Sequence, residues 1–158
     1  NLIFILFFLL ILNYLNIIFL GDNGAYLIGF LFSIFLIKIH QININLSPYF
    51  IILLLWYPSF ELLFSMIRKK TLSRSPLEPD SNHLHQLLLH FLRKKNAFKI
   101  STSNLLAAYL INAYNLIIFL ISINNITNTQ IQIILILLNL TIYTVIYFKL
   151  FILRYKKI

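Results

Sequence analysis

The 158 residues of this chain are 60% hydrophobic and only 11% charged, whereas soluble domains average about 25% charged residues. This composition excludes an ordinary soluble domain and indicates an integral membrane protein. Thirteen basic residues against four acidic ones give a formal net charge of +9. The sequence contains no cysteine, which excludes disulfides and thiolate metal sites.

The chain opens directly into an apolar run. The run starts after Asn1, without an initiating methionine or the basic region that would mark a signal peptide. We therefore expect residues 1–158 to form a single integral membrane domain, the C-terminal portion of a longer protein.

Five apolar segments are long enough to cross a bilayer, whose roughly 30 Å core takes about 20 helical residues. They are Leu2–Phe19, Ala25–Ile42, Tyr49–Ile67, Leu105–Ile123 and Ile131–Leu153. Polar turns separate them. The predicted fold is all-α, a polytopic transmembrane helix bundle with about five membrane spans.

Two acids lie at or inside these spans. Moving a carboxylate toward hydrocarbon costs roughly 2.5–3.5 kcal/mol, so such acids usually face a cavity, a partner or a metal. Asp22 stands between two glycines where the first two spans meet, and it is the first functional candidate. Glu61, in the third span, is either a buried acid bound to a neighbouring helix or a group that orients a basic residue. It lies two helical turns before Arg68, on the same face but too far for a direct pair.

The loop between the third and fourth spans, residues 68–103, carries eight of the 13 basic residues. Because Lys and Arg favour the cytoplasmic side, we expect this loop and the C-terminal tail to be cytoplasmic. Asp22, two crossings away, shares that face. Most of this charge sets topology and attracts anionic lipid headgroups. A polyanionic substrate also fits, whereas nucleic acid is not expected because no soluble domain organises the basic residues.

A short amphipathic helix at the membrane surface is predicted within this loop. Its apolar positions are Leu84, Leu87, Leu88 and Phe91. Asp80 is expected to cap it by accepting from the amide of Asn82 or His83. His83 and His85 are candidate donors to a phosphate or nucleotide, the alternative being polar residues on a wet helix face. Zinc is not expected, because two residues apart on a helix the rings would point away from each other and no third ligand completes a site.

Three motifs resemble the polyprenyl-phosphate N-acetylhexosamine-1-phosphate transferases in order and spacing. They are Phe19–Gly24 (FLGDNG), Pro58-x-x-Glu61 followed by Arg68, and Arg74–His85 (RSPxxPDxxHLH). The resemblance covers Leu2 to about Phe91. It is closer to the branch that starts O-antigen, enterobacterial common antigen and teichoic-acid linkage units than to the branch that starts peptidoglycan lipid intermediates.

This resemblance implies an enzyme that transfers a sugar 1-phosphate from a UDP-N-acetylhexosamine to polyprenyl (undecaprenyl) phosphate and releases UMP. Its site would face the cytoplasm at the bacterial inner membrane, with Mg²⁺ as cofactor and Asp22 as catalytic residue and metal ligand. The implied substrate-binding residues are Asn23, Arg68, Arg74, Asp80, His83 and His85.

The chain departs from the family pattern at Gln86, often another histidine, at Ser81, commonly arginine, and at Glu61, commonly aspartate. The family's paired-aspartate motif is absent from these residues, so the resemblance implies that this chain alone is inactive. Two alternatives stay open: a noncatalytic or degenerate membrane subunit, and a small transporter using Asp22 and Glu61. The oligomeric state is also open, with a homodimer as one alternative.

Overall fold

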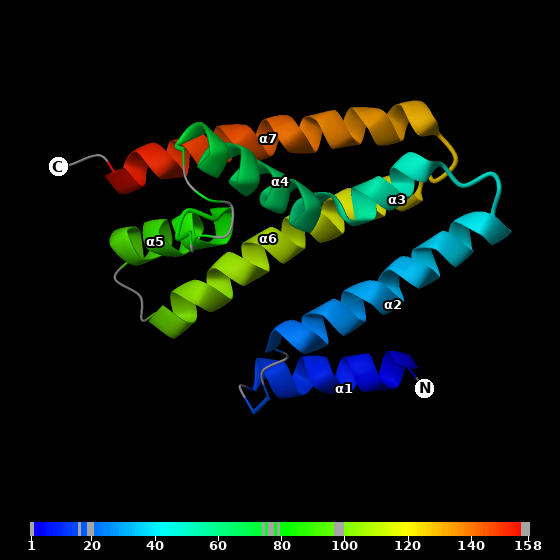
Figure 1. Cartoon of the computed structure of the whole chain (residues 1–158), viewed down its shortest axis with the longest axis horizontal. Helices are drawn as coiled ribbons and strands as arrows, with labels where there is room; N and C mark the ends of the chain where they lie inside the picture. Colours follow the sequence, from blue (N-terminus) through cyan, green and yellow to red (C-terminus); the bar gives the residue numbers. More distant parts are fainter. Residues whose placement is uncertain are drawn as a thin grey trace. The chain divides into compact units, whose positions relative to one another are not determined.

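The computed structural model describes residues 2–15, 17–18, 21–73, 75, 78, 80–96 and 100–155. All regular structure in these residues is helical, which confirms the all-α prediction. The helices are α1 (Leu2–Tyr14), α2 (Gly21–Ile42), α3 (Pro48–Leu54), α4 (Trp56–Thr71), α5 (Leu84–Asn96), α6 (Ile100–Ile123) and α7 (Thr129–Tyr155). The chain divides into two compact units, Asn1–Ile44 with α1 and α2, and Asn45–Ile158 with α3 to α7 (Figure 1).

Three helices of the described residues are long and apolar enough to cross a membrane: α2 from Asn23 onward, α6 and α7. The bent pair of α3 and α4 makes a fourth if it counts as one span. The structure therefore corrects the expected five spans to three or four. The difference arises at α1, which has 13 residues and measures about 20 Å at 1.5 Å per residue, less than the hydrocarbon thickness.

The third predicted span is broken. α3 ends at Leu54, α4 begins at Trp56, and their axes differ by 72°. Pro58 explains the position of the break, because it has no N–H to donate to the carbonyl of Leu54 and its ring collides with that carbonyl in a continuous helix. Tyr49–Ile67 was expected to be one continuous span, and this bend was not predicted.

Buried polar side chains join α6 to α7. Gln132, fully buried, donates to the carbonyl oxygens of Ser122 at 2.9 Å and Asn125 at 2.8 Å, and it accepts from the Ser122 hydroxyl at 2.6 Å. Asn128 caps α7 by accepting from the Ile131 amide at 3.2 Å. These bonds satisfy groups that would be costly to leave unpaired in hydrocarbon.

The turn before α3 is tied to the turn between α6 and α7. The Ser47 amide donates to the Ile126 carbonyl at 3.1 Å, and the Thr129 hydroxyl donates to the Ser47 hydroxyl at 3.2 Å. α3 then packs against both α6 and α7. Two turns that are far apart in the sequence therefore lie at the same end of this unit.

The amphipathic helix predicted after Asp80 is confirmed as α5, which packs against α6 and α7 (Figure 1). Leu84 and Leu87 on its apolar face are 8% and 1% exposed. They join a core made with Trp56 of α4 and with residues of α7: Tyr143, Tyr147 and Leu150. This core fixes α5 and the polar segment before it against α4 and α7, which positions the candidate site.

Candidate functional site

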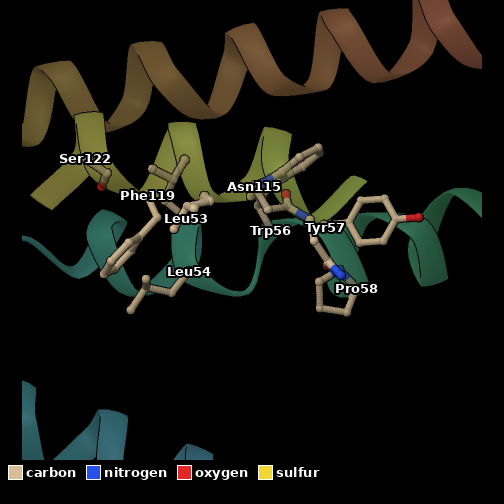
Figure 2. Close-up of a pocket in the computed structure, with 10 residues that line it drawn as sticks. Leu53, Leu54, Trp56, Tyr57, Pro58, Asn115, Phe119 and Ser122 are labelled. Carbon is tan, nitrogen blue, oxygen red and sulfur yellow. The ribbon is translucent and has the colours of Figure 1, made fainter. Parts of the chain in front are cut away.

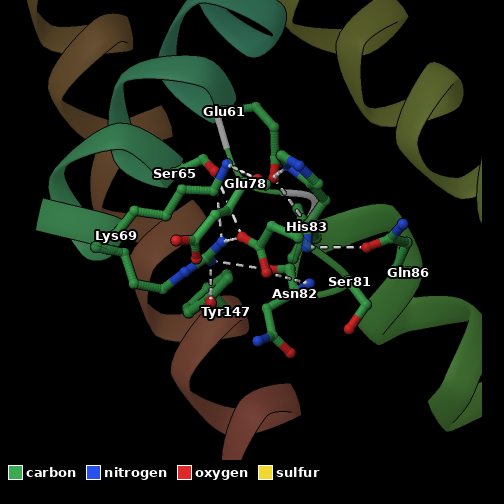
Figure 3. Close-up of polar contacts among 12 residues, drawn as sticks. Glu61, Ser65, Lys69, Glu78, Ser81, Asn82, His83, Gln86 and Tyr147 are labelled. Atoms are coloured by element: carbon green, nitrogen blue, oxygen red, sulfur yellow. Dashed lines mark hydrogen bonds and ion pairs between the residues drawn. The ribbon is translucent and has the colours of Figure 1, made fainter. Parts of the chain in front are cut away.

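Glu61 of α4 anchors the start of α5. One carboxylate oxygen, Oε1, lies 3.0 Å from Nδ1 of His83 and accepts from the Leu84 amide, also at 3.0 Å. The other oxygen, Oε2, accepts from the Tyr143 hydroxyl at 2.7 Å. Figure 3 shows Glu61 and His83 meeting in this way. The structure therefore joins the two roles that the sequence left open, since Glu61 binds a neighbouring helix and also orients a basic residue.

The contact with Glu61 determines which nitrogen of His83 is available. An ionised carboxylate only accepts hydrogen bonds, so the His83 Nδ1 that faces it carries a hydrogen. That leaves Nε2 as the nitrogen available for another partner. The side chain of His83 is 27% exposed, whereas that of Glu61 is 11% exposed. Glu61 thus fixes from the buried side a ring whose other edge is accessible.

Arg68, two turns after Glu61 on α4, binds the same segment through Asp80. The two side chains form an ion pair, 12% and 9% exposed respectively. The Arg68 guanidinium also donates to the Asn82 carbonyl at 2.9 Å and to the Tyr147 hydroxyl. As predicted, Glu61 and Arg68 do not pair directly with each other. They bind neighbouring parts of residues 80–84 instead.

Two tyrosines of α7 complete this arrangement, one turn apart. Tyr143 and Tyr147 are 2% and 1% exposed, and their hydroxyls reach Glu61 and Arg68 respectively. Both rings pack edge to face on α4, Tyr143 on Phe60 at 4.9 Å and Tyr147 on Phe64 at 4.7 Å between centroids. We call Glu61, Arg68, Asp80, His83, Tyr143 and Tyr147 the polar cluster.

Neither tyrosine was expected from the sequence. They lie about 80 residues beyond Glu61 and Arg68, outside the stretch that carries the motifs. The available signal was their spacing, because residues four apart share a helix face. Nothing in the sequence says which partners that face meets.

The segment before α5 differs in detail from the prediction. Asp80 Oδ1 accepts from the Asn82 amide at 3.0 Å, as expected. It does not cap the helix, however, because α5 begins at Leu84 with His83 as the residue before it. The His83 amide is bonded instead to Oε1 of Gln86 at 3.3 Å, one half of a capping box. Gln86, which departs from the family pattern, has a local structural role here.

His83 and His85 lie with their rings stacked. Their centroids are 5.8 Å apart and the planes differ by 13°. The expectation that these rings point away from each other was wrong, because His83 precedes the helix and does not share its geometry. Desolvation lowers the pKa of His85, the electrostatic interaction with His83 lowers it further, and Glu61 raises it. His85 is therefore favoured as a neutral ring near pH 7.

The end of α7 also binds the segment that precedes α5. The guanidinium of Arg154 donates to the carbonyl and, at 3.3 Å, to the hydroxyl of Ser81. The Tyr155 hydroxyl donates to Oδ1 of Asn82 at 2.9 Å. Residues 80–84 are therefore bound to both α4 and α7, and His83 and His85 emerge from a segment held on two sides.

Part of this chain is similar in sequence to a curated bacterial transferase. An 82-residue stretch, 52% of this chain, is 28% identical to the undecaprenyl-phosphate alpha-N-acetylglucosaminyl 1-phosphate transferase of Thermotoga maritima and covers 26% of that protein. This similarity supports membership of the polyprenyl-phosphate N-acetylhexosamine-1-phosphate transferase superfamily. It spans about a quarter of the length of this relative. No family model matches the chain, and no solved structure matches it significantly.

The residues that superfamily resemblance assigned to substrate and metal are distributed over the two units. Asp80, His83 and Arg68 lie together in the second unit, with His85 stacked on His83. Asp22 and Asn23 belong to the first unit, at the start of α2. The side chain of Asp22 and the whole of Arg74 lie outside the described residues.

The superfamily implies a magnesium ion, and the described residues do not offer it a cluster of ligands. No group of three His, Asp or Glu side chains among them could hold a metal. The carboxylate of Glu61 is bonded to His83, Leu84 and Tyr143. The carboxylate of Asp80 is paired with Arg68. In this structure both carboxylates of the polar cluster therefore accept from protein groups.

Two pockets adjoin the helix break. One, of about 310 Å³, lies between the α3–α4 break and α6, with Leu53, Trp56, Tyr57 and Asn115 among its lining residues (Figure 2). Buried polar atoms of Trp56, Tyr57 and Asn115 have no hydrogen-bond partner in the described structure. The other, of about 240 Å³, is almost wholly apolar, includes Leu84 of α5 in its lining, and adjoins the polar cluster at Tyr143. The second pocket is suited to hydrocarbon.

Proposed function

We propose that the protein to which this chain belongs transfers an N-acetylhexosamine 1-phosphate from a UDP-sugar to polyprenyl phosphate and releases UMP. Similarity to a member of the superfamily supports the reaction class. The observation that supports this reaction for the present chain is the geometry of the third motif. Glu61 and Arg68 bind residues 80–84. The rings of His83 and His85 are stacked on each other. Phosphoryl transfer depends mostly on such positioning and on charge stabilisation.

His83 and His85 are the residues we assign to the nucleotide-sugar. Because Nδ1 of His83 is directed at Glu61, Nε2 is the nitrogen of this ring that contacts the nucleotide-sugar. Asp80 and Arg68 act through this segment by fixing its backbone. Direct contacts of Arg68, Arg74 and Asn23 with substrate phosphates are part of the proposal on the strength of the resemblance. For Arg68, such a contact requires part of its guanidinium to leave Asp80 or Tyr147.

Asp22 is the magnesium ligand that we propose for this chain, again from the resemblance. Mg²⁺ typically takes one or two carboxylates together with substrate phosphate oxygens, so a single acid in this chain is compatible with such a site. The ion would neutralise charge on the diphosphate. The polyprenyl acceptor is a lipid, and the apolar pocket beside Tyr143 and Leu84 supports the proposal that its hydrocarbon chain lies near the polar cluster.

The test is UMP release by the full-length protein in membranes, supplied with UDP-N-acetylglucosamine and undecaprenyl phosphate. We expect UMP to form, and His83→Gln and His85→Gln to lower the efficiency of donor use by about tenfold or more, as expected for loss of a charge-assisted hydrogen bond. His40→Gln, on α2, is the matched control and should retain activity.

The outcomes separate the alternatives. Absence of UMP release with either UDP-N-acetylglucosamine or UDP-N-acetylgalactosamine would favour a noncatalytic membrane subunit. Normal donor use in both His83→Gln and His85→Gln would remove these histidines from the site while leaving the reaction class in place.

A further inference from the structure

A third pocket, lined in part by basic residues, lies between α5 and the end of α7. It has a volume of about 220 Å³. Its lining residues are His90, Phe91 and Lys94 of α5 with Leu150, Leu153 and Arg154 of α7. We propose that this pocket, which we call the α5–α7 pocket, binds the phosphate of an anionic membrane lipid. The proposal does not depend on the transferase reaction.

The charge of the pocket points to an anion. Its three ionisable side chains are all basic, and none of the chain's four acidic residues is among the described residues that line it. Within the described structure, His90 and Lys94 have neither a hydrogen-bond acceptor nor an acidic partner, and both are exposed. Partial desolvation of the exposed His90 ring lowers its pKa, and Arg154, Lys94 and Arg93 lower it further. The cations therefore repel one another, and an anion would relieve this repulsion.

The spacing of the residues forms one site from two helices. His90 and Lys94 are four residues apart, as are Leu150 and Arg154, so each pair projects from one face of its helix. The two helices pack together, and the Arg154 guanidinium is fixed by its bonds to Ser81. A partly immobilised guanidinium, a lysine and an imidazole thus surround one cavity.

The apolar wall and the position on α7 favour a lipid over a soluble anion. Phe91, Leu150 and Leu153 provide a hydrocarbon surface next to the basic groups. Arg154 is in the last turn of α7, a helix apolar enough to cross a membrane, so the pocket is expected at the level where lipid headgroups lie. Its volume is below the roughly 300–1,000 Å³ of pockets for drug-sized ligands. It suits a phosphate headgroup and not a whole nucleotide-sugar.

The test is lipid binding to the purified 158-residue chain in detergent, measured by native mass spectrometry. Phosphatidylglycerol is the anionic probe, phosphatidylcholine is the zwitterionic one, and inorganic phosphate is added as a competitor. We expect the first phosphatidylglycerol to bind about tenfold tighter than phosphatidylcholine and to resist millimolar phosphate. Lys94→Gln and Arg154→Gln should each weaken it severalfold, since each removes a charged donor.

Lys70→Gln is the matched control, because Lys70 is an exposed lysine near a helix end and lies outside the pocket. Equal binding of the two lipids would overturn the proposal. So would an equal loss in Lys70→Gln, which would indicate diffuse charge attraction, or displacement by inorganic phosphate, which would indicate a site for a free anion. His90→Gln keeps the size of an exposed side chain and gives a second test if Arg154→Gln disturbs the Ser81 contacts.

Discussion

At the scale of single residues, the polar cluster divides its acids between two tasks. Asp80 pairs with Arg68 and fixes the backbone before α5, whereas Glu61 binds the imidazole of His83. Buried ion pairs add little net stability, because desolvation offsets their attraction, but they are costly to break on one side only. The value of these pairs lies in holding one conformation of residues 80–84.

Replacing Glu61 by glutamine tests the orienting role. The substitution keeps the size and one acceptor oxygen but removes the charge that fixes Nδ1 of His83. In the full-length protein we expect donor kcat/KM to fall about tenfold or more, in line with about 1.5–3 kcal/mol for a hydrogen bond to a charged group. Glu78→Gln, at an exposed acid of the same loop, should change it little. If donor kcat/KM were the same in Glu61→Gln as in Glu78→Gln, Glu61 would have only a structural role.

Asp22→Asn tests the metal proposal. Asparagine keeps the size and can accept the same local hydrogen bonds at a helix start, but it lacks the charge that Mg²⁺ requires. UMP release by the full-length protein should be nearly abolished while membrane insertion and the folded state persist. Insertion is measured by membrane fractionation and folding by circular dichroism. Near-normal turnover would exclude Asp22 as the ligand.

The pKa of His90 provides a test without any substrate. It should lie below the ordinary histidine value of about 6.5, because burial and the neighbouring cations disfavour the charged ring. Arg154→Gln removes one cation, so the pKa of His90 should rise, though not fully, since partial desolvation and the lysine and arginine neighbours on α5 persist. Titration of the ring proton by NMR measures both values. An unchanged pKa in Arg154→Gln, matching that in Lys70→Gln, would contradict the geometry of the α5–α7 pocket.

Sequence patterns predicted the residues of the motif but not their partners. The amide bond of Asp80 to Asn82 and the apolar face of α5 follow from local spacing, and both are confirmed. The bonds of Tyr143 and Tyr147 to α4 depend on how α7 packs, which local spacing does not encode. The stacking of His83 on His85 was missed because Asp80 was expected to cap the helix, whereas the helix begins three residues later than that, at Leu84.

At the scale of helices, polar contacts determine how the apolar elements pair. The spans α6 and α7 were predicted to within a few residues, since hydropathy alone marks them. The break between α3 and α4 could have been predicted from Pro58, whose ring prevents a continuous helix, but hydropathy does not register it. Lipid is as apolar as leucine side chains, so it gives little drive for these helices to associate. Interhelical hydrogen bonds such as that of Gln132 select the pairing.

A double-mutant cycle measures this selection for α6 and α7. Ser122→Ala and Gln132→Ala remove the donor and the acceptor of one buried side-chain hydrogen bond. We expect a coupling energy of about 0.6–1.7 kcal/mol, the range for such bonds in membrane proteins, measured by reversible unfolding in mixed micelles. Ser122→Ala combined with Gln130→Ala, at an exposed glutamine on the same helix, should show additive effects. Additivity in the first pair would assign the helix pairing to packing alone.

At the scale of the whole molecule, the second unit has two chemically different ends. The turns at Ser47 and Ile126 are bonded to each other at one end of α7, and neither turn, 41–47 or 124–130, contains a basic residue. At the other end of α7, Arg154 and Tyr155 bind residues 81 and 82 of the basic loop. The contacts agree with the grouping that the charges predicted, with the polar cluster and the α5–α7 pocket at the basic end.

Cysteine labelling tests this sidedness directly, since the chain has no cysteine of its own. The two substitutions are Ser73→Cys in the basic loop and Thr127→Cys in the α6–α7 turn, both at exposed positions. The length of α7 is about 40 Å at 1.5 Å per residue, which is enough to separate the two ends of this unit across a bilayer. Because basic residues are retained inside, a membrane-impermeant maleimide added to intact cells should label Thr127→Cys and not Ser73→Cys. Both should react after permeabilisation, which controls for accessibility.

Labelling of the two from the same side would contradict the spanning of α6 and α7. The reverse pattern would keep the two-ended unit but place the histidines outside, where a cytoplasmic UDP-sugar could not reach them.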